Sequence, residues 1–193
     1  MNEKKLKIGI DIDEVVVEFL KGYLKFHEIN YGLKMSFEEI KNYNLWETNL
    51  FKNKEEAISG INSFQNSNDF DKLDFVEGAK ESLLKLKDSF DIYFITSRPQ
   101  YLEEKTSNFL KGILKEFGLH FSGDLFGGNK TKSEICEVLG INIFIEDNYS
   151  YALDLARKNV KTFLLSKPWN KNYEEHENIT KVNNWKEILE NLR

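Results

Sequence analysis

Short apolar runs alternate with amphipathic helical patterns along most of this chain, and this alternation limits the folds that are open to it. The runs cover residues 7–10, 92–95, 141–145 and 160–165, and a further strand is expected at 121–126. Apolar spacings of three and four predict helices at 78–87, 102–117, 131–139, 151–158 and 185–192. Gly118 and Gly140 are the expected ends of two of these helices. Strands that alternate with helices pair in parallel, so the sequence predicts an α/β fold with a parallel sheet flanked by helices.

Residues 17–74 depart from this alternation. A long helical pattern places Phe19, Leu20 and Tyr23 on one face, and Gly32 is its expected end. Short helices and loops rich in aromatic residues follow, beginning at a capping box expected at Ser36. We therefore expect a small helical cap at 17–74, inserted after the first strand, and a core made of residues 1–16 and 75–193.

The composition limits the kinds of partner that the chain can bind. Its formal net charge of -5 at pH 7 provides no basic field for tight binding of duplex nucleic acid. The one cysteine, Cys136, permits no intrachain disulfide, which fits a reducing cytoplasm. No apolar run is long enough for a transmembrane span or a signal peptide. The sequence therefore predicts a cytoplasmic protein with no membrane partner, whose ligand is a small molecule held by a few local cations.

Three of the predicted strands end in polar residues whose side chains can bind a ligand or take part in catalysis. The first strand ends at Asp11 and Asp13, the second at Thr96-Ser97-Arg98, and the fourth at Glu146-Asp147. Each group alone has an ordinary structural interpretation, as a turn, a helix cap or a polar loop. Ligands of open parallel sheets bind outside the carboxyl ends of the strands, so three such ends in one chain indicate a shared site.

The residue types at these strand ends suit phosphate chemistry with a hard cation. Asp11, Asp13 and Asp147 offer oxygen ligands, which Mg²⁺ prefers, and Mg²⁺ also keeps several waters. A carboxylate can attack phosphorus to form an aspartyl-phosphate, and a nearby cation offsets the repulsion between the two anions. Thr96 and a lysine would hold the remaining phosphate oxygens. The sequence thus predicts a magnesium site that takes a small phosphorylated molecule.

Four motifs in this order resemble those of the haloacid dehalogenase (HAD) superfamily. They are Asp11-Ile12-Asp13-Glu14-Val15, Ile95-Thr96-Ser97-Arg98, a lysine at the start of a helix, and Ile145-Glu146-Asp147. The resemblance covers nearly the whole chain. It implies a HAD-like core with five parallel strands, Asp11 as the nucleophile and Asp13 as the general acid and base. It also implies Mg²⁺ bound by Asp11, Asp147 and the backbone carbonyl of Asp13.

Two lysines compete for the phosphate-binding position, because Lys130 and Lys132 flank Thr131. If Thr131 is the N-cap, Lys132 occupies the first helical position, where backbone N–H groups also face an anion. We favour Lys132 for this reason, and Lys130 on the preceding loop remains the alternative. The expected phosphate-binding residues are therefore one of these lysines together with Thr96, Ser97 and Arg98.

Within the superfamily, the chain resembles the 5′(3′)-deoxyribonucleotidase family of cytosolic type C. The resemblance is carried by Glu18-Phe19, Thr96-Ser97-Arg98-Pro99, Ile145-Glu146-Asp147-Asn148 and Pro168-Trp169-Asn170. It implies a nucleoside monophosphate as substrate, with Phe19 stacked on the base, although Phe19 could equally pack in the core. Trp169 is expected to be a packing residue. Glu14 departs from the family pattern, because it stands where glycine is common.

The resulting prediction is a cytoplasmic, Mg²⁺-dependent phosphatase of nucleoside monophosphates, for which a homodimer is a compatible state. Two alternatives stay open. One is a HAD phosphatase for another small phosphate ester or for a phosphorylated nucleic-acid end. The other is a phosphate-binding protein of the same fold without turnover, against which the intact Asp11, Asp13 and Asp147 argue.

Overall fold

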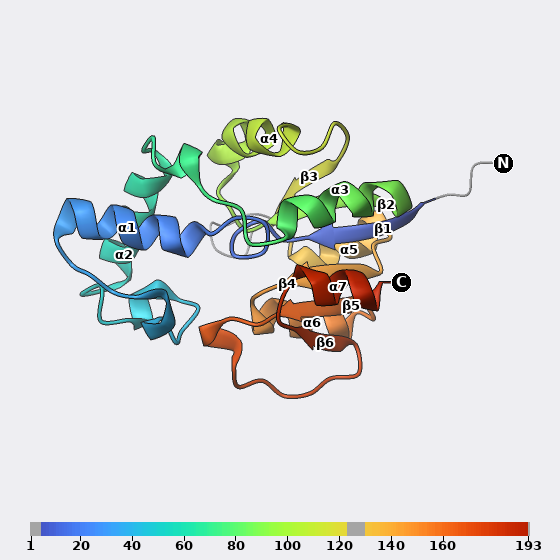
Figure 1. Ribbon diagram of the computed structural model, residues 1–193. Helices are drawn as coiled ribbons and strands as arrows, with labels where there is room; N and C mark the ends of the chain where they lie inside the picture. Colours follow the sequence, from blue (N-terminus) through green and yellow to red (C-terminus); the bar gives the residue numbers. More distant parts are fainter. Residues whose placement is uncertain (1–4, 123–129, 193) are drawn as a thin grey trace.

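The computed structural model describes residues 5–122 and 130–192. Its centre is one sheet of six parallel strands in the order β3-β2-β1-β4-β5-β6 (Figure 1). The strands are β1 (Leu6–Ile10), β2 (Phe90–Thr96), β3 (Gly118–Phe121), β4 (Ile143–Glu146), β5 (Lys161–Leu165) and β6 (Ile179–Val182). The parallel pairing confirms the predicted α/β fold.

Helices cover both faces of this sheet. On one face lie α3 (Ala79–Ser89) and α7 (Trp185–Asn191), where Leu83 and Trp185 join buried side chains of β1 and β2 in one core cluster. On the other face lie α5 (Lys132–Leu139) and α6 (Tyr149–Arg157), which pack around Phe144 and Leu155. Coverage of both faces explains why the strands read as short continuous apolar runs in the sequence.

The helix expected at 102–117 is shorter than predicted. α4 (Glu103–Lys111) ends at Gly112. Gly118, which the sequence pattern assigned to the end of this helix, is instead the first residue of β3. A Cβ atom at Gly118 would lie 2.4 Å from the Tyr93 ring of β2, so the close approach of the two strands requires glycine. The prediction was wrong because this contact is not local in the sequence.

The sheet also differs from the prediction at its two edges. β3 shares only Phe121 with the strand expected at 121–126, and residues 123–126 of that prediction lie outside the described residues. At the other edge, β6 is a sixth strand, where the resemblance implied five. Only the two end residues of β6, Ile179 and Val182, are buried, so its apolar pattern is too short to indicate a strand.

Residues 19–72, called the helical segment below, extend beyond the carboxyl end of β1 (Figure 1). The segment contains α1 (Phe19–Tyr31), α2 (Lys54–Gln65) and three single 3₁₀ turns at Phe37–Glu39, Leu45–Glu47 and Phe70–Lys72. Its buried side chains, which include Tyr23 and Phe64, form a hydrophobic cluster together with Leu102 from outside the segment. This cluster is separate from the clusters that cover the sheet.

The helix ends and the capping box that the sequence predicts are formed in the structure. α1 ends where Gly32 adopts a left-handed φ of 71°, and α5 ends in the same way at Gly140. The expected capping box at Ser36 is formed, since the Glu39 carboxylate accepts the Ser36 N–H at 2.7 Å. Among the residues described, no helix has the length and apolar character needed to cross a membrane.

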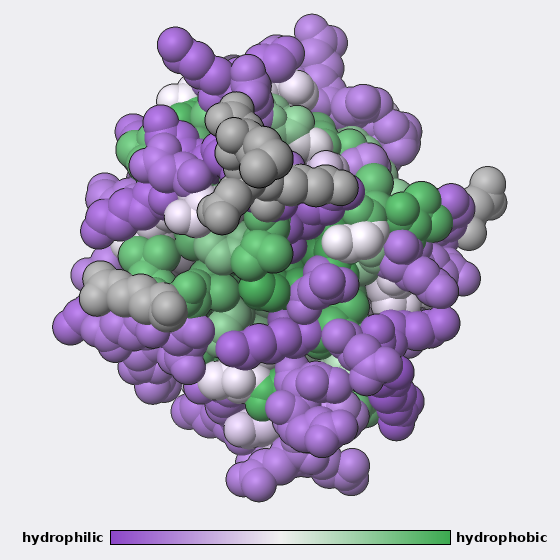
Figure 2. All heavy atoms as spheres, turned by 90° about the vertical axis from the view of Figure 1, so that its right-hand side faces the viewer, coloured by the Kyte–Doolittle hydropathy of each residue, from purple (hydrophilic) through white to green (hydrophobic). Residues whose placement is uncertain are grey.

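Figure 2 views the molecule from the amino ends of the strands, opposite the helical segment. Hydrophobic residues gather in the middle of this face and hydrophilic residues surround them. A hollow at the amino end of β2 is lined by Phe90, Ile92 and Ile113 together with Lys5 and Asp91. The polar residues at the carboxyl ends of β1, β2 and β4 lie at the other end of the sheet.

Candidate active site

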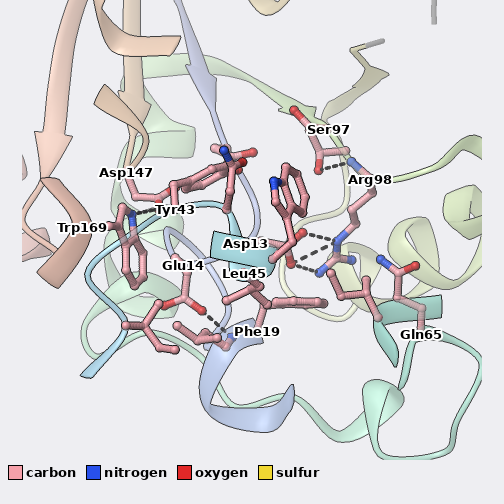
Figure 3. A pocket seen from close by; sticks show the side chains of 17 residues that line it. Asp13, Glu14, Phe19, Tyr43, Leu45, Gln65, Ser97, Arg98, Asp147 and Trp169 are labelled. Carbon is pink, nitrogen blue, oxygen red and sulfur yellow. Dashed lines mark hydrogen bonds and ion pairs between the residues drawn. The ribbon is translucent and has the colours of Figure 1, made fainter. Parts of the chain in front are cut away.

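The carboxyl ends of the three central strands meet at one pocket (Figure 3). β1 lies between β2 and β4, so Asp11, Thr96 and Asp147 at or just after their ends lie side by side. The pocket is closed on its other side by residues of the helical segment. The predicted site residues that line it are Asp11, Asp13, Phe19, Thr96, Ser97, Arg98 and Asp147.

Three buried carboxylates come together at the ends of β1 and β4. Asp11, Glu146 and Asp147 each bring one oxygen within 4.8 Å of the others. The Lys132 ammonium pairs with two of them, at 2.9 Å from Asp11 Oδ1 and 2.7 Å from Glu146 Oε2. Glu146 Oε1 accepts the N–H groups of Asp147 and Asn148, both at 3.0 Å. Glu146 therefore holds both the lysine and the turn that carries Asp147.

The structure brings Lys132, and not Lys130, into this cluster. Thr131 Oγ1 accepts the Glu134 N–H at 3.2 Å, and the Glu134 carboxylate accepts the Thr131 N–H at 2.8 Å. This capping box starts α5 at Lys132, as the sequence predicts. The Lys132 side chain is 2% exposed, whereas Lys130 lies on the surface.

Burial and crowding of like charges raise the pKa values of Asp11 and Asp147. Burial raises the pKa of Asp11 to about 7 against the lowering effect of Lys132, and the Glu146 carboxylate adds to the rise. Burial, together with Glu146 and Asp11, raises the pKa of Asp147 well above its usual range. Burial alone would lower the pKa of Lys132, but Asp11 and Glu146 raise it, so the lysine stays charged.

The cluster fits a divalent cation such as Mg²⁺. Three carboxylates carry more negative charge than one lysine offsets, so a further cation would relieve the repulsion between Asp11 and Asp147. The three carboxylates offer hard oxygen ligands, the type that Mg²⁺ prefers. Glu146 was not among the predicted site residues, although a signal was available, because it directly precedes Asp147 in the fourth motif.

The carboxylate of Asp13 lies outside the cluster and pairs with Arg98 (Figure 3). Arg98 Nη2 donates to Asp13 Oδ1 at 2.6 Å, and Arg98 Nε donates to Oδ2 at 3.0 Å. The guanidinium also donates to Thr106 Oγ1 at 3.1 Å and lies over the Phe70 ring at 4.9 Å. This two-pronged pairing fixes the direction of the Asp13 carboxylate. The phosphate contact expected of Arg98 stays a prediction.

Thr96 and Ser97 lie at the end of β2, beside Arg98. Thr96 Oγ1 accepts the Arg98 N–H at 3.2 Å, and Ser97 Oγ lies 3.1 Å from Ser122 Oγ. Both residues are buried and both line the pocket together with Asp11. Their position is compatible with the predicted contacts to phosphate oxygens, which remain a prediction.

Glu14 lies where the chain leaves the sheet for the helical segment. Its φ of 61° falls in the left-handed region that favours glycine, in keeping with the family preference at this position. Glu14 Oε1 accepts the Leu20 N–H at 2.5 Å, and Oε2 lies 3.7 Å from Lys167 Nζ. Burial raises the pKa of Glu14 to about 7, and Lys167 opposes this rise. The carboxylate thus satisfies a free N–H in the first turn of α1.

The outer wall of the pocket is mostly apolar and comes from the helical segment. Phe19 lines the pocket, and its ring also packs edge-on against Phe64 at 5.5 Å. Both interpretations of Phe19 therefore have a structural basis. The wall is completed by Leu20, Ile40, Tyr43, Leu45, Trp46 and Ile61, with carboxamides from Asn44 and Gln65.

Trp169 does more than the packing expected of it. Its ring packs edge-on against Phe37 at 5.5 Å, and its indole Nε1 also donates to Asp147 Oδ2 at 2.9 Å. The two residues lie in different loops, after β5 and after β4. No spacing rule links such loops, so the sequence pattern could not reveal this bond.

Comparisons with known proteins place the chain in a family. It matches the family model of 5′ nucleotidase, deoxy (Pyrimidine), cytosolic type C protein over residues 4–192. It is 24% identical over 189 residues to "Putative nucleotidase YqfW" of Bacillus subtilis (strain 168), an alignment that covers 96% of this chain and 92% of that protein. Both matches span almost the whole chain.

Solved structures of HAD hydrolases share the fold. The haloacid dehalogenase-like hydrolase SP0104 from Streptococcus pneumoniae has a TM-score of 0.69 at 14% identity, with 98% of this chain and 99% of that chain covered. The "putative HAD-hydrolase YfnB from Bacillus subtilis bound to magnesium" has a TM-score of 0.65 at 12% identity, with the same coverage. The fold and the family match make the protein a phosphatase, a hydrolase of phosphoric monoesters, and the chain belongs to the 5′ nucleotidase, deoxy (pyrimidine), cytosolic type C family.

Proposed function

We propose that this chain is a Mg²⁺-dependent phosphatase that hydrolyses a nucleoside monophosphate through an aspartyl-phosphate intermediate. The observation that carries the proposal is the set of groups that surround the Asp11 carboxylate. Its buried carboxylate pairs with Lys132 and lies in a carboxylate cluster, in a pocket whose outer wall is aromatic and apolar. A phosphate group beside Asp11 would direct the attached nucleoside toward that wall. A preference for deoxyribonucleotides, suggested by the family, is part of the proposal.

In the proposed reaction, a carboxylate oxygen of Asp11 forms a bond to phosphorus while the bond from phosphorus to the ester oxygen breaks. Asp13 enters this step as the carboxylic acid, having bound a proton beforehand, and donates that proton to the leaving oxygen. A water then attacks phosphorus, Asp13 accepts a proton from the water, and the bond between the Asp11 oxygen and phosphorus breaks to release inorganic phosphate. Arg98 holds the Asp13 carboxylate at the pocket for both transfers.

The remaining predicted site residues would bind the phosphate and the cation. Lys132 supplies a charge beside Asp11, while Thr96, Ser97 and Arg98 supply donors at the end of β2. Asp11 and Asp147 would hold Mg²⁺, together with the backbone carbonyl of Asp13 that the HAD resemblance implies. When bound, the cation offsets the repulsion between Asp11 and the phosphate.

We further propose that residues 17–74 form a cap over the catalytic core made of 1–16 and 75–193. The two connections between these parts run side by side, because Val76 donates its N–H to the Val16 carbonyl at 2.9 Å and Glu18 donates to the Asp74 carbonyl at 2.9 Å. The separate hydrophobic cluster of the helical segment lets the segment act as a unit. The cap would then determine which nucleoside the pocket accepts.

Phe19→Ala is expected to lower kcat/KM for the best nucleoside monophosphate by about five- to a hundredfold. Stacking of a base on an aromatic ring is worth roughly 1–3 kcal/mol by alanine substitution. A small aryl phosphate lacks the base, so its hydrolysis should change much less. Steady-state kinetics with both substrates and a melting curve measure the effect.

The matched control for Phe19 is Phe26→Ala. The Phe26 ring also packs against Phe64, at 5.3 Å, but Phe26 is not among the residues that line the pocket. This variant should lose packing energy without losing preference for the nucleotide. Parallel loss of both activities in Phe19→Ala, with a melting temperature as low as that of Phe26→Ala, would contradict the stacking role.

A phosphate-release screen tests the proposed function. The substrates are ribo- and deoxyribonucleoside 5′- and 3′-monophosphates, sugar phosphates, an aryl phosphate and an oligonucleotide with a phosphorylated end. We expect the highest kcat/KM with a nucleoside monophosphate, loss of activity in EDTA and recovery with Mg²⁺. A higher kcat/KM with a sugar phosphate or with the oligonucleotide would favour that substrate class over a nucleoside monophosphate. Full activity in EDTA would reject the dependence on Mg²⁺. Phosphate binding without turnover would indicate a phosphate-binding protein of the same fold.

A cytoplasmic location and a homodimer stay predictions from the sequence.

A further inference from the structure

The turn after β5 reaches the active site, although it lies outside the four HAD motifs. Residues Pro168–Asn170 form a single 3₁₀ turn. The buried Asn170 carboxamide donates to the backbone oxygens of Asp147 and Leu165, at 2.7 and 2.8 Å. Lys181 of β6 donates to the Asn170 carbonyl at 2.7 Å. The turn is thus tied to the ends of two strands and to the edge strand, which fixes its position relative to Asp147.

From this fixed position, Trp169 contacts the carboxylate of Asp147 (Figure 3). Indole Nε1 donates to Asp147 Oδ2 at 2.9 Å, and Asp147 is 1% exposed. An indole has one N–H donor and no acceptor, so it cannot ligate a cation itself. It can restrict the rotation of a carboxylate that does.

The same indole contacts the helical segment. Its ring meets the Phe37 ring edge-on, at 5.5 Å between centroids and an interplanar angle of 64°. Trp169 also lines the pocket. One side chain therefore joins the Asp147 carboxylate, the pocket wall and the proposed cap.

We propose that Trp169 is a positioning residue that orients Asp147 for the divalent cation. The inference rests on the proposed function, because it takes Asp147 as a cation ligand. Loss of the N–H would free the Asp147 carboxylate to rotate, so the cation would have to restrict it on binding. Partners that hydrogen-bond to ligating groups typically contribute about 10–100-fold to metal affinity. Trp169→Phe, which keeps an aromatic ring and removes the donor, should show a loss of this size.

The test measures cation binding without substrate, using Mn²⁺ as the probe and the electron paramagnetic resonance signal of the free ion as the readout. The full chain is compared with Trp169→Phe, Trp185→Phe, Phe37→Leu and Asp147→Asn. Trp185 is the matched control, because its buried indole donates to the Val15 carbonyl at 2.8 Å and it is not among the residues that line the pocket. Phe37→Leu removes the aromatic packing of Trp169 and keeps its hydrogen bond.

We expect the Kd for Mn²⁺ to rise about 10–100-fold in Trp169→Phe and at least as much in Asp147→Asn. Trp185→Phe and Phe37→Leu should stay within about threefold of the parent, well below that effect. Any of three results would overturn the inference alone. These are a Kd of Trp169→Phe within the range of the controls, an equal loss of Mn²⁺ affinity in Phe37→Leu, and a Trp169→Phe variant that does not fold. A parent chain that binds no cation would overturn the magnesium proposal and this inference together.

Discussion

Asp11→Asn is expected to reduce phosphate release from the best nucleoside monophosphate by at least about a thousandfold. The amide has no anionic oxygen to attack phosphorus, so the covalent route through Asp11 is closed, and each tenfold loss corresponds to about 1.4 kcal/mol of barrier. The measurement is kcat at saturating substrate and Mg²⁺. A residual rate within about tenfold of the parent would exclude Asp11 as the nucleophile.

The same variant should remain folded, and its stability should depend less on pH than that of the parent. Because burial raises the pKa of Asp11 to about 7, the folded parent binds more protons than the unfolded chain between about pH 4 and 7. The Asp11 contribution to stability is therefore fully present below pH 4 and is lost as the pH rises toward 7. In cation-free buffer, the melting temperature of Asp11→Asn should fall less over this range than that of the parent. Some fall should remain, because the pKa of Asp147 is also raised.

Lys132→Met should produce the second largest effect, on activity and on stability together. Removal of a preorganised group that stabilises developing charge typically costs about 10²–10³ in kcat. The substitution also leaves Asp11 and Glu146 without the ammonium that pairs with both, and breaking a buried ion pair on one side typically costs about 3–5 kcal/mol. For a chain of this length, that corresponds to a fall in melting temperature of roughly 6–20 °C.

The destabilisation of Lys132→Met should shrink at acidic pH, because protonation removes the uncompensated charge of the carboxylates. Lys130→Met is the control, since it removes the other candidate lysine, which lies on the surface. It should change kcat by no more than about twofold and the unfolding free energy by no more than about 0.5 kcal/mol. The reverse pattern, with activity lost in Lys130→Met and kept in Lys132→Met, would assign the phosphate to Lys130.

Several features of the fold were predictable because their causes are local. Thr131 and Glu134 form a capping box over three residues, and Gly32 ends α1 in the left-handed conformation that glycine favours. The strands at the edges of the sheet were harder to predict from the sequence. Gly118 belongs to β3 because of its contact with Tyr93, and this contact joins residues of two different strands.

The sequence by itself determined that the residues after β1, β2 and β4 lie at one edge of the sheet. Strand and helix patterns are local, and in a parallel sheet all carboxyl ends lie at one edge, so Asp11, Thr96 and Asp147 could be placed together before any distance was known. The order of the four motifs then pointed to the HAD superfamily, which the family match confirms.

Only the tertiary structure decided which of these groups pair with one another. Lys132 joins Asp11 to Glu146, Arg98 holds Asp13 outside the carboxylate cluster, and the indole of Trp169 bonds to Asp147. These pairings depend on distances of a few ångströms between segments that are far apart in the sequence, and on burial, which strengthens each charge interaction. Neither quantity is encoded in the spacing of residues along the chain.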